Sequence, residues 1–186
     1  MAKPRFPPTA IRRKRRTPEA RFHMDFLWSP WRYRYVSSLP SSECLFCRVA
    51  ADRDDKSNFV LLRAERNLIM LNRFPYTSGH LMIAPYQHVA TIEEADEAAL
   101  GEMMTLARRA ESALRRAYKP DGLNLGMNIG RSAGAGIAEH IHMHLLPRWH
   151  GDVNFMTAVG ETRVLPEDLE TTYARLKPLL AAGEPE

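Results

Sequence analysis

Three histidines alternate with apolar residues near the end of the chain, in the run His140-Ile141-His142-Met143-His144. A β-strand directs successive side chains to opposite faces, so this spacing predicts that all three imidazoles leave one face of one strand. Imidazole titrates near neutral pH and serves as a nucleophile, an acid–base group or a metal ligand. The run therefore indicates a functional site, and the apolar residues between the histidines are expected to face a core.

The middle histidine, His142, is the candidate nucleophile. A neutral imidazole nitrogen attacks phosphorus well and also leaves well, provided that a carbonyl or carboxylate accepts from the other nitrogen and fixes the tautomer. Flanking histidines such as His144 can donate to phosphate oxygens or pass a proton to a leaving group. The alternative is a metal-binding face or a set of hydrogen-bonded core histidines.

A glycine-rich segment lies just upstream of the histidines, between Asn128 and Gly136. Small residues allow backbone N–H groups to approach and cradle a phosphate. Arg131 adds positive charge, and the Ser132 hydroxyl can donate a hydrogen bond. Alone, such a segment is usually only a tight turn. Beside the histidines it predicts a phosphate site that includes Asn128, Ser132, Gly134 and Gly136.

A second set of residues has the types and number of a metal site. The chain has 2 cysteines, Cys44 and Cys47, which excludes a disulfide framework. A C-x-x-C pair in an apparently cytosolic chain indicates metal or redox chemistry. Together with His88 and His140 the pair makes the four ligands of a tetrahedral, structural zinc ion. The alternative is a free thiol pair with His88 on a surface loop.

Asn72 is a further candidate, because it follows a predicted strand and precedes Ser78, Gly79 and His80. An asparagine at a strand end can bind a ribose hydroxyl or a phosphate. A turn-capping asparagine is the alternative interpretation.

The elements that must position these residues follow an α+β pattern. Apolar residues recur at helical spacing from Ile92 to Ala117, which predicts one long helix capped by Thr91 and ending before Pro120. A second helix is expected to begin near Pro166. Strands are predicted over residues 59–63, 68–71, 80–85, 123–128 and 140–146. The result is an antiparallel sheet with one long helix across it and a C-terminal helix.

The composition is that of an ordinary globular protein, with 186 residues, 45% hydrophobic and 26% charged. No apolar run is long enough to span a membrane, and the N-terminus lacks the apolar stretch of a signal peptide. We therefore expect a cytoplasmic protein without membrane contact.

The basic charge is concentrated at the N-terminus. The whole chain has a net charge of +4, but residues 1–23 carry eight lysines and arginines against one acid, which leaves the remainder acidic. Such a block predicts a disordered extension over residues 1–24, followed by one catalytic domain over 25–186. Nucleic-acid binding by the extension is the alternative, and Met24 is a second possible start.

The histidine run resembles the His-φ-His-φ-His-φ-φ signature of the histidine triad (HIT) superfamily, where φ is apolar. Residues 79–88 are similar to that family's upstream strand, and Asn72 stands where the family has a nucleotide-contacting asparagine. The resemblance extends from about Cys44 to Met156. It implies an α+β nucleotidyl hydrolase or transferase, commonly a homodimer.

The resemblance also implies roles for individual residues. His142 would attack the α-phosphate of a nucleotide and form a covalent nucleotidyl-histidine, which phosphate, water or another acceptor then resolves. His144 would contact phosphate and assist the leaving group, and Asn128 would lie near the phosphate. Cys44 and Cys47, with His88 and His140, are similar to the zinc set of the family's zinc-containing branches.

Residues 133–136, 147–156 and the aromatic N-terminal segment are similar to the bacterial branch of diadenosine tetraphosphate phosphorylases. This branch implies phosphorolysis of a dinucleoside polyphosphate. One alternative is a HIT hydrolase with water as acceptor, including an AMP-amine phosphoramidase. Another is a non-enzymatic, zinc-containing module that binds nucleotides or nucleic acid. The glutamine common in the hydrolases is missing from the loop before the histidines, which favours the transferase.

Overall fold

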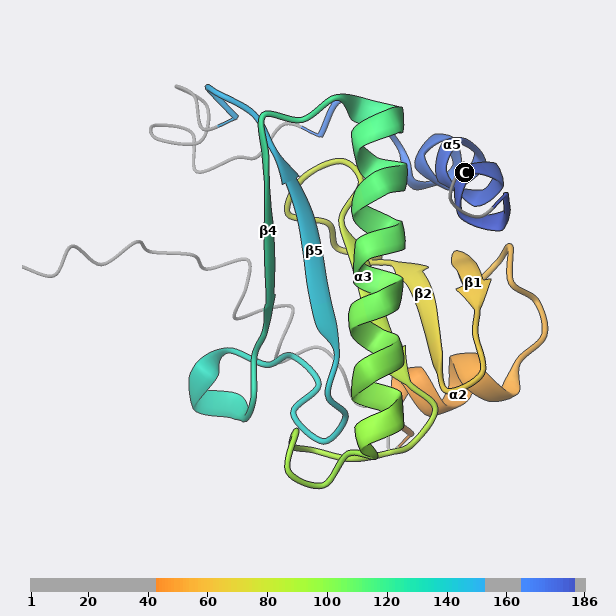
Figure 1. Cartoon of the computed structure of the whole chain (residues 1–186), viewed down its shortest axis with the longest axis vertical. Coiled ribbons are helices and arrows are strands. Elements are labelled where there is room, and N and C mark those ends of the chain that lie inside the picture. The colour runs from red at the N-terminus through yellow and green to blue at the C-terminus, as the bar shows by residue number, and fades with distance from the viewer. Residues whose placement is uncertain (1–42, 153–164, 183–186) are drawn as a thin grey trace, which may run out of the picture.

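A five-stranded antiparallel sheet, in the order β1-β2-β3-β5-β4, forms the centre of the computed structural model (Figure 1). The structure describes residues 43–152 and 165–182. The predicted extension over 1–24, its boundary at residue 25 and the segment 153–156 lie outside the described residues. The strands are β1 (Val60–Arg63), β2 (Asn67–Leu71), β3 (Leu81–Pro85), β4 (Gly122–Met127) and β5 (Met143–Arg148).

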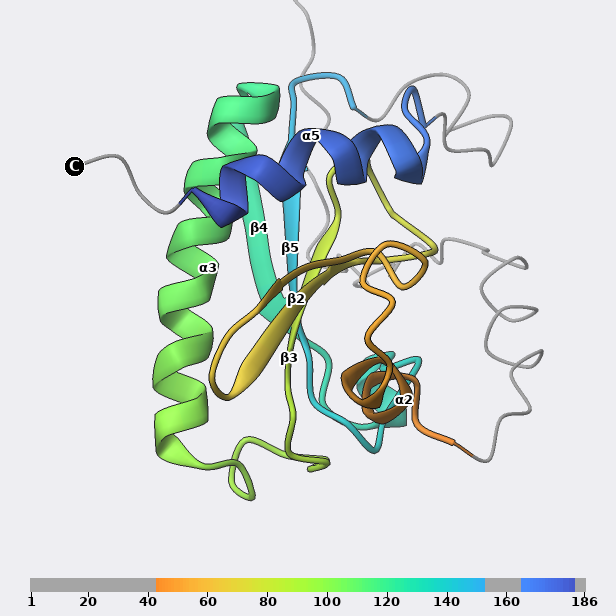
Figure 2. The ribbon, with the colours of Figure 1, turned by 90° about the vertical axis from the view of Figure 1, so that its right-hand side faces the viewer.

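Helices pack on both sides of this sheet, so the predicted α+β class is confirmed. They are α2 (Leu45–Ala51), α3 (Glu97–Tyr118) and α5 (Leu169–Ala181), together with the single 3-10 turn η1 (Arg131–Ala133). Figure 2 shows the sheet between α3 and α2, with α5 across one end. No helix in the described part of the chain is long and apolar enough to cross a membrane.

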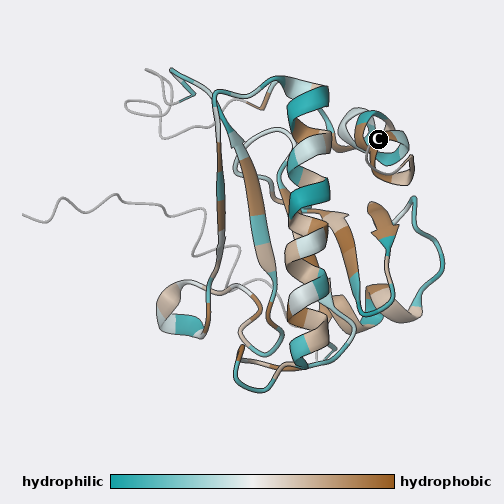
Figure 3. Ribbon diagram, viewed as in Figure 1, coloured by the Kyte–Doolittle hydropathy of each residue, from teal (hydrophilic) through white to brown (hydrophobic). Residues whose placement is uncertain are grey.

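The alternation of side chains along the central strands supplies two separate cores. Odd-numbered residues of β2 and β3 pack beneath α3 and α5, whereas even-numbered residues pack against α2. The first set includes Ile69, Leu71, Leu81 and Ile83, and the second includes Leu68, Met70, Met82 and Ala84. Figure 3 shows the matching pattern on α3, where hydrophilic and hydrophobic bands alternate along the helix.

The same alternation determines which face receives the histidines. Met143 and Leu145 of β5 join the core beneath α3, as predicted. His144 lies opposite Met82 in the sheet register and therefore faces the α2 side. His144 thus lies on the face of the sheet opposite the long helix.

Both predicted helix starts differ from the structure, each for a local reason. The long helix begins at Glu97, because Asp96 caps it by accepting from the Ala98 N–H at 3.0 Å. Thr91 instead closes a turn, in which the Glu94 carboxylate accepts from the Ala90 and Thr91 N–H groups at 3.0 and 3.2 Å. The C-terminal helix begins beyond Pro166 because Asp168 is its cap.

The other predicted strands agree with the structure to within one residue at each end, but the histidine strand does not. It begins at Met143, so His144 is the one histidine of the three on the strand itself. Before it, the Ile141 N–H donates to the Val89 carbonyl at 2.8 Å instead of joining the sheet.

The short helix α2 was not predicted from the sequence. Its first residue follows Cys44, and helical spacing brings Cys47 to the same side. Arg63 anchors its C-terminal end, because the guanidinium donates to the carbonyls of Val49, Ala50 and Asp52 at 2.9, 3.1 and 2.6 Å. A helix this short depends on such tertiary contacts for its stability.

Two adjacent methionines of α3 test the assigned core face. Met103 is 1% exposed and Met104 is 53% exposed. We expect Met103→Ala to lower the free energy of unfolding by about 3 kcal/mol, because it leaves a cavity, and Met104→Ala to change it by less than about 0.5 kcal/mol. Urea denaturation measures both, and equal effects would contradict the assignment.

Candidate functional site

A cavity of about 990 Å³ opens on the α2 side of the sheet. Its lining brings together all the residues predicted to act in catalysis or substrate binding. These are Asn72, Asn128, Ser132, Gly134, Gly136, His142 and His144. His140 is not part of the lining, which agrees with its predicted separation from the other two histidines.

The His142 ring is held in one orientation. Its Nδ1 lies 2.9 Å from the His140 carbonyl oxygen, which can only accept, so Nδ1 carries the proton and Nε2 keeps its lone pair. The Phe46 ring of α2 packs against it at a centroid distance of 4.8 Å. Burial lowers the pKa of His142 below its ordinary value, which favours the neutral imidazole that a nucleophile requires.

His144 is oriented by a fourth histidine, His80, from the segment before β3. The Tyr76 N–H donates to His80 Nδ1 at 3.1 Å, so the proton of His80 is on Nε2. This Nε2 lies 2.9 Å from His144 Nδ1 and donates to it, which places the proton of His144 on Nε2. From the sequence, His80 stands out only as a neighbour of Asn72. His80 and His144 are 64 residues apart, so no local pattern indicates their contact.

The glycine-rich segment forms a compact turn at the edge of the cavity. Gly130 and Gly134 have φ angles of 80° and 89°, a left-handed conformation that favours glycine. The N–H groups of Gly134 and Ala135 donate within the turn, to Arg131 and Gly130. These N–H groups therefore shape the turn. Within the described part of the chain, the Ser132 hydroxyl has no hydrogen-bond partner.

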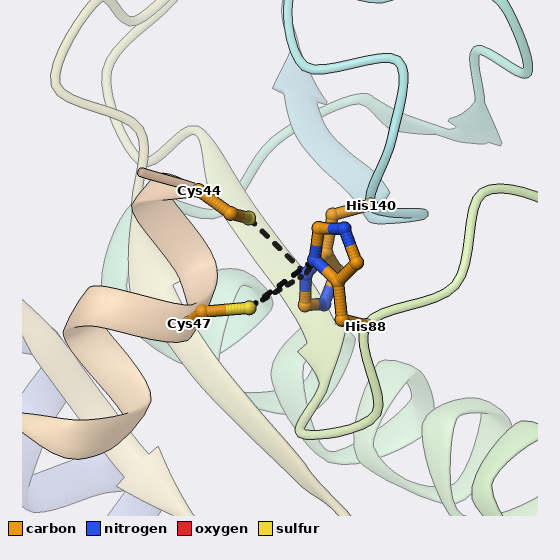
Figure 4. A group of neighbouring side chains, drawn as sticks. All are labelled: Cys44, Cys47, His88 and His140. Carbon is orange, nitrogen blue, oxygen red and sulfur yellow. Dashed lines mark hydrogen bonds between the residues drawn. The ribbon is translucent and has the colours of Figure 1, made fainter. Parts of the chain in front are cut away.

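The predicted metal ligands converge on one point, beside the cavity (Figure 4). Their ligand atoms all lie within 4.8 Å of one another. Cys44 Sγ is 3.3 Å from His140 Nδ1, Cys47 Sγ is 3.2 Å from His88 Nδ1, and the two Nδ1 atoms are 3.2 Å apart.

This donor set fits zinc. A tetrahedral zinc ion about 2.0–2.3 Å from each ligand atom requires those atoms to be roughly 3.3–3.8 Å apart. His140 Nε2 donates to the Pro85 carbonyl at 2.9 Å, which leaves Nδ1 unprotonated and directed at the cluster. His140 thus has two contacts: its ring belongs to the cluster, and its backbone carbonyl accepts from the His142 ring.

The chain matches a known protein family over more than half of its length. The family described as HIT domain matches residues 53–151. The chain belongs to the HIT domain family. The matched span includes His88 and the three histidines, whereas Cys44 and Cys47 precede it.

Individual HIT proteins give the relationship more detail. An AP-4-A phosphorylase of Mycobacterium tuberculosis is 33% identical over 160 residues, covering 82% of each chain. An uncharacterised HIT-like protein of Saccharolobus solfataricus is 32% identical over 61% of this chain and 79% of its own. Membership in the HIT family and the first of these relatives support a nucleotide-processing enzyme.

Solved structures agree with the fold. A zinc-bound histidine triad protein from Mycobacterium smegmatis has a TM-score of 0.61 and 27% identity, over 75% of this chain and 94% of that one. A histidine triad nucleotide-binding protein from Sulfolobus tokodaii has a TM-score of 0.60 and 27% identity, over 75% and 93%.

The ring orientations can be tested without substrate. We expect ¹⁵N–¹H correlation spectra of the imidazoles to show His142 protonated on Nδ1 and His144 protonated on Nε2. His80→Phe removes the donor to His144, so His144 should then populate both tautomers while His142 keeps its own. A His144 ring that stays protonated on Nε2 alone in this variant would contradict the hydrogen-bond chain.

Proposed function

We propose that the chain cleaves diadenosine tetraphosphate, or a related dinucleoside polyphosphate, by phosphorolysis through a covalent adenylyl-His142. The observation that carries the proposal is the orientation of His142, whose Nδ1 is bound to the His140 carbonyl at 2.9 Å while the ring lines the cavity. The similarity to the M. tuberculosis phosphorylase supports this substrate and acceptor.

The reaction proceeds in two displacements at one phosphorus. His142 Nε2 attacks the α-phosphorus, the bond to the bridging oxygen breaks, and ATP leaves as the anion while its departing oxygen accepts a hydrogen bond from His144 Nε2. An oxygen of inorganic phosphate then attacks the same phosphorus, the phosphorus–nitrogen bond breaks, and ADP leaves. His142 is regenerated with its Nδ1 proton in place.

The remaining cavity residues hold the substrate. Asn72, which follows β2, is suited to a ribose hydroxyl. Asn128 and the Ser132 hydroxyl donate to the α-phosphate, and Gly134 and Gly136 keep the turn narrow enough for that phosphate to approach. These positions line the same cavity as the two catalytic histidines.

Cys44, Cys47, His88 and His140 would hold a structural zinc ion. The ion would fix the start of α2 to the segment before β5 and so hold Phe46 against His142. It supplies no chemistry to the reaction. Its role is to keep the His140 carbonyl and the Phe46 ring in place.

The nucleophile is tested by substitution and by the products. We expect His142→Ala to lower turnover of diadenosine tetraphosphate by roughly three orders of magnitude or more, the scale of losing a nucleophile. His150→Ala is the matched control, because His150 is outside this cavity and its side chain is 94% exposed.

The acceptor is read from the same assay with wild-type protein. With phosphate present we expect ADP and ATP as products. AMP and ATP instead would assign a hydrolase with water as acceptor, and substantial activity of folded His142→Ala protein would contradict the covalent mechanism itself.

The zinc site has its own test. Protein purified without chelator should contain about one zinc per chain, and Cys47→Ser should lose most of it, since a closed structural site needs all four ligands. A chelator should lower the melting temperature of wild-type protein but not of Cys47→Ser. Less than about half a zinc per wild-type chain would contradict the assignment.

A further inference from the structure

Two arginines line the same cavity as the catalytic histidines, and no step above uses them. Arg48 comes from α2 and Arg131 from η1. Both elements lie at the lower end of the sheet in Figures 1 and 2. Both side chains are exposed, so they belong to the mouth of the cavity, whereas the buried His142 and His144 belong to its floor.

Neither guanidinium has a strong partner within residues 43–152 and 165–182. Arg48 forms no ion pair and no side-chain hydrogen bond with any residue in the described ranges. In the same ranges the Arg131 guanidinium makes one ion pair, at 3.5 Å to Glu139, between side chains that are 85% and 75% exposed. An exposed pair of this length contributes little. Both groups can therefore turn to an anionic ligand at low cost.

A third lining arginine shows the contrast. Arg73 donates from Nη2 to the Ser57 carbonyl at 2.8 Å, and its guanidinium lies 5.9 Å from the centroid of the Phe59 ring. Its charged group is thus committed to the protein. Arg48 and Arg131 thus differ from Arg73, because their guanidinium groups remain able to bind an anionic ligand.

The direction of the proposed reaction indicates which part of the substrate the Arg48 and Arg131 guanidinium groups would contact. When His142 on the floor attacks the α-phosphate, the other phosphates of the leaving nucleotide extend towards the mouth. A guanidinium binds phosphate oxygens with two parallel, charge-assisted hydrogen bonds. An adenylyl compound with an uncharged leaving group offers no such oxygens beyond the α-phosphate.

We propose that Arg48 and Arg131 bind the phosphates of the leaving nucleotide and make the site selective for dinucleoside polyphosphates over adenylyl compounds with uncharged leaving groups. This inference rests on the proposed function for the position of the attacked phosphate. It narrows the substrate class of that site.

The test measures binding, so that it does not depend on turnover. In the His142→Ala protein, which cannot form the adduct, calorimetry gives the dissociation constants of diadenosine tetraphosphate and of AMP. Arg48→Ser and Arg131→Ser should each weaken diadenosine tetraphosphate by on the order of tenfold and leave AMP within about twofold, as expected for a lost charge-assisted hydrogen bond. Arg131→Lys should restore part of the loss.

Arg116→Ser is the matched control, because Arg116 is an exposed arginine of α3 that does not line the cavity. It should change neither constant. The proposal is overturned if the arginine substitutions weaken both ligands equally, or weaken neither. Failure of the proposed function would appear separately, as wild-type protein that releases no ADP from diadenosine tetraphosphate in the presence of phosphate.

Discussion

The hydrogen bond between His142 Nδ1 and the His140 carbonyl is the constraint on which the site depends. It selects one tautomer, and that tautomer leaves a lone pair on the nitrogen that can reach a substrate. His140 can serve this purpose because it is itself fixed, by Pro85 through Nε2 and by the cysteine–histidine cluster through Nδ1. His140 therefore joins the cysteine–histidine cluster to His142, the proposed nucleophile.

The helix α2 extends the same constraint to the other side of the ring. It begins at the cluster through Cys44, carries Cys47 one turn later, and places Phe46 between His140 and His142 at 5.1 and 4.8 Å. Phe46 is buried with the even-numbered residues of β2 and β3. The apolar packing of this face therefore also positions the ring of His142, the proposed nucleophile. The opposite face, beneath α3, is packed independently.

Periodicity made much of this architecture predictable, and contacts distant in the sequence made the rest unpredictable. Alternation along one strand is enough to separate His144 from the core, and the metal ligands follow from residue type. The helix start at Thr91 was wrong because Thr91 and Glu94 close a local turn upstream, whereas Asp96 caps the helix itself. The hydrogen bond of His80 to His144, and the helix over 45–51, arise from tertiary packing that no local pattern records.

The proposed mechanism requires that His142 becomes covalently adenylylated. It is tested most directly by mixing the protein with diadenosine tetraphosphate in the absence of phosphate, quenching rapidly at a pH that preserves phosphorus–nitrogen bonds, and mapping the modified peptide by mass spectrometry. We expect an adenylyl group on His142 alone, which is released as ADP when phosphate is added before the quench. An adduct on another residue would contradict the proposed mechanism. So would protein that forms ADP when phosphate is present but shows no adduct at any time after mixing without phosphate.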